Sequence, residues 1–356
     1  MKKVLVTGAS GFIGSYIVSE GLEKDFEMWA GMRGTSSKGY LQDKRIKFAQ
    51  LNLGDKNQLK QQLEALKSEM GGAWDYVVHA AGATKCLKIE DFYHTNTQGT
   101  INLIEALQEA DMVPERFVFV SSLSVFGAIR ETPVKTPVQG YGKGAEISEE
   151  ESIYNPILPT DNPEPNTAYG KSKLASEQYI QSCKGLRYII FRPTGVYGPR
   201  ERDYFKMVQS IASHVDFSVG YTPQVITFIY VKDLVKAIYA AIANGVADRC
   251  YLVSEPRGYD SRSFSDYIQN KLGIRYVLRI KAPLWLLKAI SVCAEGISRI
   301  TGKPGTLNSD KYNIMKQRNW LCDTTPIEKE LGFTIDYTLQ QGTKEMIAWY
   351  KKEKWL

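Results

Sequence analysis

A glycine-rich turn close to the amino terminus constrains the fold more than any other feature of the chain. The stretch "VTGASGFIG" places Gly8, Gly11 and Gly14 directly after the apolar run 3–8 and directly before an amphipathic segment. In parallel α/β sheets this strand, turn and helix arrangement holds the pyrophosphate of a dinucleotide, with one glycine for the turn, one for close phosphate approach and one for helix packing. Free amide groups at the helix start attract the phosphates. The stretch therefore predicts a dinucleotide-binding site.

Apolar runs recur between residues 3 and 193 and are continuous rather than alternating, as in strands that are buried on both faces. They span 3–8, 26–32, 46–51, 75–82, 116–122 and 187–193. Helix-like segments such as 57–69 and 97–110 lie between them. Alternating strands and helices predict an α/β fold with a doubly wound parallel sheet of the Rossmann type.

The regular alternation is interrupted twice. A proline- and glycine-rich segment between Gly127 and Tyr169, which includes Pro137, is longer than an ordinary connection and predicts a functional loop. After about residue 254 the patterns become mostly helical. We therefore predict two domains and a smaller, mostly helical carboxyl-terminal part. The dinucleotide-binding domain comprises 1–195 and 226–254, and the substrate-binding domain comprises 196–225 and 255–356.

Composition narrows the classes of partner. Lys and Arg exceed Asp and Glu by 45 to 39 in 356 residues, without a basic block, so the mild positive charge favours anionic ligands and gives no reason to expect nucleic acid. The five cysteines are scattered and never spaced as CxxC, which argues against a disulfide framework and a metal site. The three histidines are dispersed and are expected to be structural. The scattered cysteines suit a reducing cytoplasm. The start of the chain has too few consecutive apolar residues for the core of a signal peptide, so we expect a cytoplasmic protein.

Arg33 bears on the type of dinucleotide. An acidic residue about 20 positions after the glycine turn often binds the adenosine ribose hydroxyls. Here Arg33, in "GMRGTSSK", stands near that position at the end of the second predicted strand. A guanidinium attracts a 2′-phosphate that a carboxylate would repel. Arg33 therefore favours NADP, with NAD as the alternative cofactor, whereas an exposed loop arginine without a ligand is the structural alternative.

The pair Tyr169 and Lys173 is the candidate acid and base. The spacing Tyr-x-x-x-Lys alone is weak evidence, since it also occurs at Tyr40/Lys44, Tyr267/Lys271, Tyr312/Lys316 and Tyr350/Lys354. Tyr169 differs by position, because it opens a helix-forming stretch between the long loop and the strand 187–193. At i and i+4 both side chains share one helix face. Free tyrosine titrates at about 10, so an adjacent ammonium would help it to act near neutral pH.

Serines at the end of the fifth predicted strand are candidate hydrogen-bond donors to a substrate oxygen. The stretch "FVFVSSLSVFG" offers Ser121, Ser122 and Ser124. Strand ends on this edge of the sheet face the cofactor. Serines after a strand often only form turns, so their interpretation depends on the glycine turn and on Tyr169 and Lys173.

These motifs together resemble the extended short-chain dehydrogenase/reductase family, also called NAD-dependent epimerase/dehydratase. The resemblance covers residues 1–255 through "TGASGFIG", "HAAG" (79–82), "NTQGT" (96–100), "SSLSVFG" (121–127), "YGKSK" (169–173), "RPTGVYGP" (192–199) and "YVKDLVKAI" (230–238). It implies that Ser122, Tyr169 and Lys173 are catalytic. It also implies a homodimer and a structural role for Asn96.

The resemblance also implies contacts with the cofactor: Asn52 with the adenine, Ala80, Ala81 and Gly82 along the cofactor, and Pro193 and Thr194 beside the nicotinamide. With the glycine turn, Arg33 and their neighbours, the full expected cofactor set is Gly8, Ser10, Gly11, Phe12, Ile13, Gly14, Arg33, Asn52, Leu53, Ala80, Ala81, Gly82, Ser121, Pro193 and Thr194.

Departures from the family's patterns bear on the reaction. Leu123 stands where dehydratases of the family carry an acid, which argues against dehydration. Gly195 and Ile226 replace an Asn and an Arg that hold the nucleotide diphosphate in sugar-nucleotide epimerases. The form "RPTGVYGP" is more similar to the branch of 3β-hydroxysteroid dehydrogenases and dihydroflavonol reductases.

We therefore predict an NAD(P)-dependent oxidoreductase that transfers a hydride to or from a secondary alcohol or ketone carbon of a bulky, apolar small molecule. A sugar-nucleotide epimerase or reductase anchored by Arg200, Arg202 or Arg262 is the second hypothesis, and a non-catalytic dinucleotide sensor is the third. The segment 282–303 predicts a helix with an apolar face and basic flanks. Packing within its own domain is favoured for this helix over capping a pocket or lying on a membrane surface.

Overall fold

The computed structural model describes residues 1–135, 146–147, 151–301 and 307–356. The chain forms two compact units. The first comprises residues 1–125, 168–192 and 235–251, and the second comprises 126–167, 193–234 and 252–356. The interrupting segment before Tyr169 thus belongs to the second unit, while Pro137 and the end of the predicted helix at 302–303 lie outside the described residues. The assignment of a function to each domain stays a prediction.

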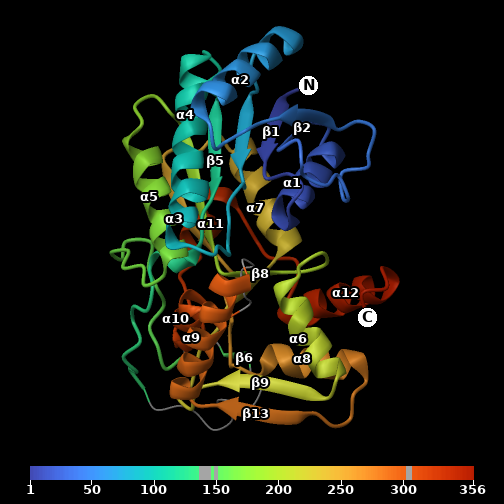
Figure 1. The fold of residues 1–356 in the computed structure, drawn as a ribbon, viewed down its shortest axis with the longest axis vertical. Coiled ribbons are helices and arrows are strands. Elements are labelled where there is room, and N and C mark those ends of the chain that lie inside the picture. The colour runs from blue at the N-terminus through green and yellow to red at the C-terminus, as the bar shows by residue number, and fades with distance from the viewer. Residues whose placement is uncertain (136–145, 148–150, 302–306) are drawn as a thin grey trace. The chain divides into compact units, whose positions relative to one another are not determined.

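A seven-stranded sheet forms the centre of the first unit (Figure 1). The strands are β1 (Lys3–Thr7), β2 (Glu27–Met32), β3 (Lys47–Gln50), β4 (Tyr76–His79), β5 (Arg116–Val120), β7 (Tyr188–Pro193) and β11 (Arg249–Val253). Their order is β11-β7-β5-β4-β1-β2-β3, and the pairings from β7 through to β3 are parallel. The strand order reverses between β1 and β4. Sheets of this kind bind ligands at such a reversal, outside the carboxyl ends of the strands. The predicted doubly wound parallel sheet is confirmed.

Helices connect the strands of this sheet. They are α1 (Phe12–Glu23), α2 (Lys56–Met70), α3 (Ile89–Phe92), the π-helix η1 (Tyr93–Gln98), α4 (Gly99–Glu109), α5 (Ala168–Ser182) and α7 (Val231–Ala243). Local sequence sets the ends of α2. The Asp55 side chain accepts a hydrogen bond from the amide of Gln58, and Gly71 ends the helix in a left-handed conformation with φ 66°. The helical segments predicted at 57–69 and 97–110 therefore agree with α2 and α4 to within a few residues.

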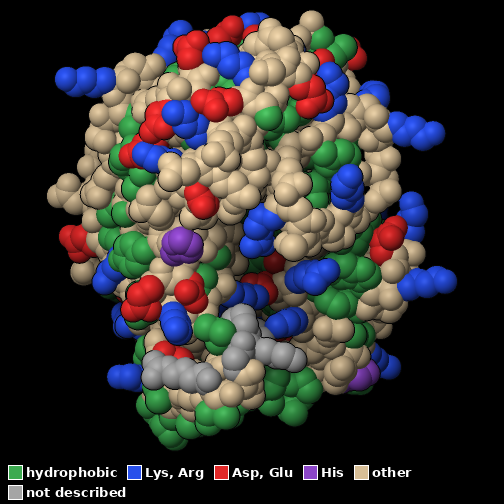
Figure 2. Space-filling view, turned by 45° about the horizontal axis from the view of Figure 1, so that its top comes forward, with side chains coloured by type: hydrophobic (Ala, Val, Ile, Leu, Met, Phe, Trp, Pro, Cys, Tyr) green, Lys and Arg blue, Asp and Glu red, His purple; other side chains and the backbone are tan. Residues whose placement is uncertain are grey.

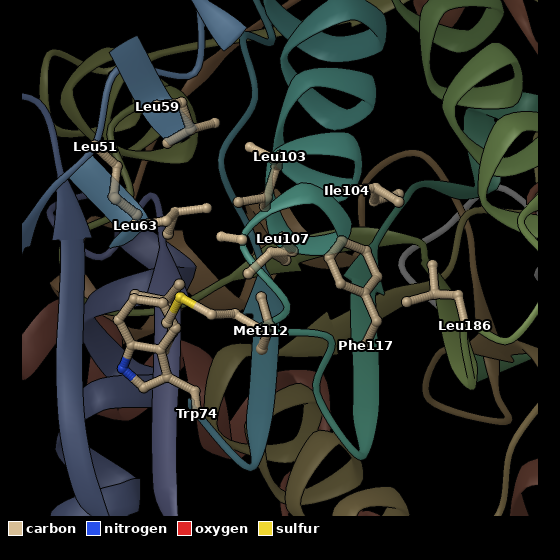
Figure 3. Close-up of a cluster of buried hydrophobic side chains, with 14 of the residues drawn as sticks. Leu51, Leu59, Leu63, Trp74, Leu103, Ile104, Leu107, Met112, Phe117 and Leu186 are labelled. Carbon is tan, nitrogen blue, oxygen red and sulfur yellow. The ribbon is translucent and has the colours of Figure 1, made fainter. Parts of the chain in front are cut away.

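The core of the first unit lies between the sheet and the helices α2 and α4, as Figure 3 shows. Leu59 and Leu63 of α2 and Leu103 and Leu107 of α4 are buried there, in one cluster with Trp74. Because α2 carries apolar residues near three-four spacing on one side only, its opposite side stays polar. This packing fixes the carboxyl ends of β4 and β5, which carry candidate site residues.

The second unit contains small sheets and most of the carboxyl-terminal helices. The strands β8 (Gly195–Tyr197) and β10 (Phe228–Tyr230), β6 (Glu146–Ile147) and β12 (Gly258–Tyr259), and β9 (Val215–Val219) and β13 (Leu278–Ala282) form three two-stranded sheets. The helices are α6 (Asp203–Ala212), α8 (Ser263–Leu272), α9 (Leu284–Thr301), α10 (Ser309–Lys316), α11 (Thr325–Leu331) and α12 (Leu339–Lys352). In the first unit, a 3-10 helix, η2 (Leu123–Val125), follows β5 after Ser121 and Ser122.

Aromatic side chains dominate the core of the second unit. Tyr197, Phe228, Tyr230 and Phe264 pack together with ring centroids about 5 to 6 Å apart. Among the residues that the structure describes, no helix combines the length and the apolar character needed to cross a bilayer.

Candidate active site

The glycine turn has the geometry that its sequence predicts. Gly8 adopts a φ of +69°, and the amide of Gly11 donates a 2.9 Å hydrogen bond to the Gly8 carbonyl. A Cβ on Gly8 would lie 2.7 Å from the backbone of Ala81, and a Cβ on Gly14 would overlap the carbonyl oxygen of Gly8. Only glycine fits these two positions. The turn therefore brings the end of β1 against Ala81, which follows β4.

The start of α1 offers unused amide groups. The first main-chain hydrogen bond of the helix runs from the amide of Ser15 to the carbonyl of Gly11 at 3.0 Å, so the amides of Phe12, Ile13 and Gly14 precede it. Gly11 caps the helix without a side-chain hydrogen bond. Such a helix start attracts anions. Ser10 precedes Gly11 in the same turn and is half-buried.

A buried serine hydroxyl supports the same interpretation. Ser121 follows β5 and is almost fully buried, yet its Oγ atom has no hydrogen-bond partner among the described residues. Leaving a buried hydroxyl unpaired costs about 1 to 3 kcal/mol. A ligand oxygen could satisfy it. The amides of α1, the turn and the Ser121 hydroxyl together form a donor set that fits a dinucleotide.

Arg33 lies directly after β2, as predicted. Its side chain is exposed and forms neither a hydrogen bond nor an ion pair with any other described residue. Its carbonyl accepts a 2.9 Å hydrogen bond from the amide of Ser36, which fixes the turn that carries it. The guanidinium is thus available to an anion. Lys38, in the same loop, instead places its ammonium 3.8 Å from the centre of the Phe48 ring.

Asn52 and Leu53 have local structural contacts. The Asn52 side chain accepts a hydrogen bond from the amide of Gly54 at 3.2 Å and donates one to the Gln58 side chain at 2.5 Å. Leu53 packs against the core of the first unit, and its carbonyl accepts a 2.8 Å hydrogen bond from the Asn102 side chain. The expected contact of Asn52 with adenine stays a prediction, since these bonds already occupy the amide group in part.

Ser122 and Tyr169 are brought together from distant parts of the chain. Ser122 follows β5, Tyr169 lies in the first turn of α5, and the two side chains share a hydrogen bond. Burial raises the pKa of the Tyr169 phenol to about 12, and the hydrogen bond with Ser122 opposes that increase. The phenol is therefore protonated near neutral pH. Ser122 is oriented in turn by Ser124, whose hydroxyl lies 3.1 Å away and whose amide lies 3.2 Å away.

Lys173 is buried one turn further along α5. Its Nζ atom donates a 2.8 Å hydrogen bond to the carbonyl oxygen of Val120 and lies 4.4 Å from the centre of the Phe119 ring. A Cβ on Gly82 would be 3.3 Å from that Nζ atom, so the glycine after Ala81 leaves room beside the amine. Burial lowers the pKa of Lys173 to about 8, while the carboxylate of Glu177 acts in the opposite direction.

The sequence interpretation placed the ammonium next to the phenol. Among the described residues, Lys173 forms no hydrogen bond with Tyr169, and its amine is bound to the main chain instead. A main-chain carbonyl leaves no signal in the sequence, so this contact could not have been expected from it.

Asn96 and His79 support the site without facing a ligand. The Asn96 side chain accepts from the amide of Ala83 at 2.7 Å and donates to the hydroxyl of Ser172 at 2.9 Å, which links the segment after Gly82 to α5. His79 is buried between the hydroxyls of Thr7 and Thr100, at 2.6 and 3.0 Å. Burial, with a smaller contribution from Lys173, lowers its pKa to about 3. It is therefore neutral.

A buried ion pair adjoins Lys173 and was missed in the sequence. Glu177 lies four residues after Lys173 on α5 and pairs with Arg192 of β7 at 2.6 Å, with both side chains almost inaccessible. In the sequence, the four-residue spacing from Lys173 to Glu177 places the two side chains on one helix face, and this spacing was the signal that could have pointed to Glu177. Pro193 and Thr194 belong to the second unit, where the amide of Thr194 binds the Val253 carbonyl at 3.1 Å and its hydroxyl, within the described residues, has no partner.

The fold and these residues define a Rossmann enzyme with a dinucleotide turn and a Ser, Tyr and Lys set. The chain belongs to the NAD-dependent epimerase/dehydratase family, which its sequence matches over residues 4–254. It is thus an enzyme of the extended short-chain dehydrogenase/reductase type, as the motifs indicated.

Curated relatives of the chain have different activities. It is 25% identical to a UDP-glucose 4-epimerase of Vibrio cholerae, with 97% of this chain and 94% of the relative covered. It is 23% identical to a decarboxylating sterol-4-alpha-carboxylate 3-dehydrogenase of Dictyostelium discoideum, with 97% and 100% covered. Among solved structures, a dTDP-glucose 4,6-dehydratase of Streptomyces venezuelae with NAD bound superposes with a TM-score of 0.74 at 20% identity, over 99% and 98% of the two chains. These relatives share the family and differ in their substrates.

Proposed function

We propose that the chain is an NADP(H)-dependent oxidoreductase acting on a secondary alcohol or ketone within a bulky, apolar substrate. The hydrogen bond between Ser122 and Tyr169 is the observation that carries this proposal. It places two hydroxyl groups where both can contact one substrate oxygen. When bound, the nicotinamide supplies or accepts the hydride.

The residues of this chain would handle the oxygen and its proton. Ser122 donates a hydrogen bond to the substrate oxygen, and Tyr169 transfers a proton from its Oη atom to that oxygen during reduction. In the oxidative direction Tyr169 takes the proton back. The phenol is protonated in the protein without ligands, because its pKa is raised to about 12. Lys173, anchored on Val120 beside Gly82, would hold the nicotinamide ribose and favour the tyrosinate.

Arg33 supports NADP over NAD. Its exposed guanidinium has no partner among the described residues and follows β2, where the ribose of the adenosine is expected. Solved relatives, such as the dehydratase of Streptomyces venezuelae, are described with NAD. NAD therefore remains the alternative cofactor, and the side chain at position 33 is the feature that separates the two.

Three positions support an apolar substrate over a sugar nucleotide. Leu123 beside Ser122 is buried and provides no acid for dehydration. In the second unit, a side chain at Gly195 would overlap the phenol oxygen of Tyr204, so the space of the expected asparagine is filled by an aromatic ring. Ile226 packs against the aromatic core of that unit. The Dictyostelium relative, described as a sterol dehydrogenase, has a substrate of the proposed kind.

A sugar-nucleotide epimerase is the second candidate, favoured by the Vibrio relative. Its diphosphate would need a basic anchor. Arg262 is already engaged, because it pairs with the buried Asp216 at 2.7 Å and donates a hydrogen bond to Ser218 at 3.1 Å. The guanidinium of Arg202 lies 5.8 Å from the centre of the Trp355 ring.

Nicotinamide absorbance separates the two candidates. The purified protein is incubated with NADPH and a series of cyclic apolar ketones, and in parallel with NAD and UDP-sugars. The proposal expects a fall in absorbance with at least one ketone, and no such fall in a matched Ser122→Ala variant. Interconversion of UDP-sugars without a net change in absorbance, together with inert ketones, would instead identify an epimerase.

Location and assembly complete the proposal. All five cysteines are free thiols, which suits the reducing cytoplasm that we propose for this enzyme. The homodimer implied by the resemblance is retained as a proposal, and small molecules rather than nucleic acids are its proposed ligands.

A further inference from the structure

A two-stranded ribbon in the second unit has an apolar face that is exposed. The strands β9 and β13 pair in parallel, with Phe217 opposite Ile280. Side chains of paired residues point to the same side of a sheet. One side of the ribbon therefore consists entirely of apolar residues, which we call the ribbon face: Val215, Phe217, Val219, Leu278, Ile280 and Ala282.

The ribbon is oriented the opposite way from a strand pair that shields a hydrophobic core. On the ribbon face, Phe217 is 62% and Leu278 is 64% exposed. On the other side Asp216 and Ser218 are buried, and Asp216 is paired with Arg262 at 2.7 Å. A half-buried sheet normally places its apolar side inward and its polar side in water. The exposed apolar side, fixed by a buried ion pair behind it, is typical of an interaction surface.

Aromatic residues and a helix extend the exposed apolar area. Tyr221 follows β9, Tyr276 precedes β13 and Trp285 begins α9, and all three are more than 60% exposed. Rings with a polar tip favour the boundary between water and lipid. The helix α9 also exposes Ile297 and Ile300, so its predicted apolar face is only partly used for packing. Figure 2 shows hydrophobic side chains gathered at the lower edge of the view, and Figure 1 draws β9 and β13 of the second unit at that edge.

The charge around the ribbon face is positive. Residues 271–292 contain no Asp or Glu but five basic residues, which are Lys271, Arg275, Arg279, Lys281 and Lys288. Arg279 pairs with Asp266 of α8, whereas Lys281 and Lys288 form no ion pair with a described residue. Lys281 instead lies 5.3 Å from the centre of the Tyr221 ring. Lys281 alternates with Ile280 along β13 and belongs to the other side of the ribbon, so the positive charge is a property of the whole segment 271–292. An apolar face within a positively charged segment matches a surface that is apolar inside and anionic outside.

We propose that the ribbon face docks the protein on the surface of a membrane that contains anionic lipid. Phe217, Leu278 and Trp285 would enter the headgroup region, and the positive charge of residues 271–292 would attract lipid phosphates. A second copy of the chain fits less well, since two ribbon faces brought together would place two positively charged 271–292 segments near each other. The proposal depends on the second unit alone and is independent of the reaction proposed above.

Vesicle sedimentation tests the proposal on the full chain. The probes are vesicles of phosphatidylcholine alone and vesicles in which part of it is replaced by phosphatidylglycerol. We expect binding to the anionic vesicles, weaker binding at high salt, and little binding to neutral ones. Phe217→Glu and Leu278→Glu should each lower the partition coefficient about tenfold or more, because an apolar side chain that would enter the headgroup region is replaced by a charge that anionic lipid repels. Lys281→Glu should lower it in the anionic vesicles.

Matched substitutions control for general effects of charge. Val113→Glu changes an exposed valine of the first unit, and Lys44→Glu reverses an exposed lysine there; both should bind as the wild type does. Circular dichroism and the midpoint of thermal unfolding check that each variant is folded. The proposal is overturned if the protein does not bind anionic vesicles, or if both ribbon-face variants bind unchanged. It is also overturned if light scattering shows a dimer that Phe217→Glu dissociates, because a second copy would then cover the face.

Discussion

The Nζ atom of Lys173 donates a 2.8 Å hydrogen bond to the carbonyl oxygen of Val120, the last residue of β5. This bond attaches the helix that carries Tyr169 to the strand end that leads into Ser122. It also keeps a titratable amine buried above the Phe119 ring. The position of the amine therefore follows from the sheet rather than from the phenol.

Burial of Lys173 predicts a specific dependence of stability on pH. Its pKa is about 8 in the fold, against an ordinary 10.5 in the unfolded chain. Between these values the unfolded state binds more protons, so the stability from this group rises with pH across that window and is lowest below it. Lys173→Met removes the titration. Urea unfolding should show the wild type gaining stability relative to the variant as pH rises above 8, and a difference that stays constant would contradict the burial of the amine.

Arg33 predicts the cofactor preference. Arg33→Ala should raise the KM for NADPH by about tenfold or more, since it removes charge-assisted hydrogen bonds to a phosphate, and should leave the KM for NADH almost unchanged. Lys38→Ala is the matched control, because Lys38 lies in the same loop but packs on Phe48. Equal effects of Arg33→Ala on both cofactors would show that no 2′-phosphate is bound there.

The close approach of Gly14 to Gly8 predicts that one added methyl group lowers the stability of the fold. Its added Cβ would overlap the Gly8 carbonyl oxygen, so Gly14→Ala should lower the free energy of unfolding by about 1 to 3 kcal/mol. Gly296→Ala, in a helix where nothing lies near the added Cβ, should stabilise the protein by up to about 1 kcal/mol. Thermal unfolding measures both changes. A neutral Gly14→Ala would mean that the turn is looser than described.

The ion pair of Glu177 and Arg192 predicts strong coupling. Both side chains are buried, so Glu177→Ala should destabilise the fold by about 3 to 5 kcal/mol by leaving the guanidinium without its partner. Replacing both residues, with Glu177→Leu and Arg192→Met, should recover most of that loss. A double-mutant cycle in urea measures the coupling, and additive effects would contradict the pairing.

Much of the fold could be predicted because it depends on local patterns. Continuous apolar runs located six of the seven strands of the central sheet but not β11, and three-four spacing located α2 and α4. The π-helix Tyr93–Gln98 before α4 was not foreseen, since its widened turn has no distinct residue signature. The sequence also did not predict which face of the β9 and β13 ribbon is exposed. Alternating residues in "VDFSV" and "LRIKA" predict two faces but not which one turns inward.

The candidate site was predicted less completely. The spacing of Tyr169 and Lys173 also occurs in α8, at Tyr267 and Lys271, so only the position along the chain separated the two pairs. The serine that accompanies Tyr169 came from the family resemblance. The partners of Lys173 could not be predicted, because Val120 contributes a main-chain carbonyl and Phe119 contributes a ring whose burial depends on the whole sheet.

Turnover by a Tyr169→Phe variant tests the central claim most directly. The variant keeps the ring and removes only the hydroxyl that binds Ser122 and that we propose as the proton donor. We expect kcat with an active ketone to fall by at least about a hundredfold, as for the loss of a general acid, while the Kd for NADPH measured by fluorescence stays within about twofold. A variant that retained most of its turnover would show that Tyr169 is not the proton donor, and the proposed site would be wrong.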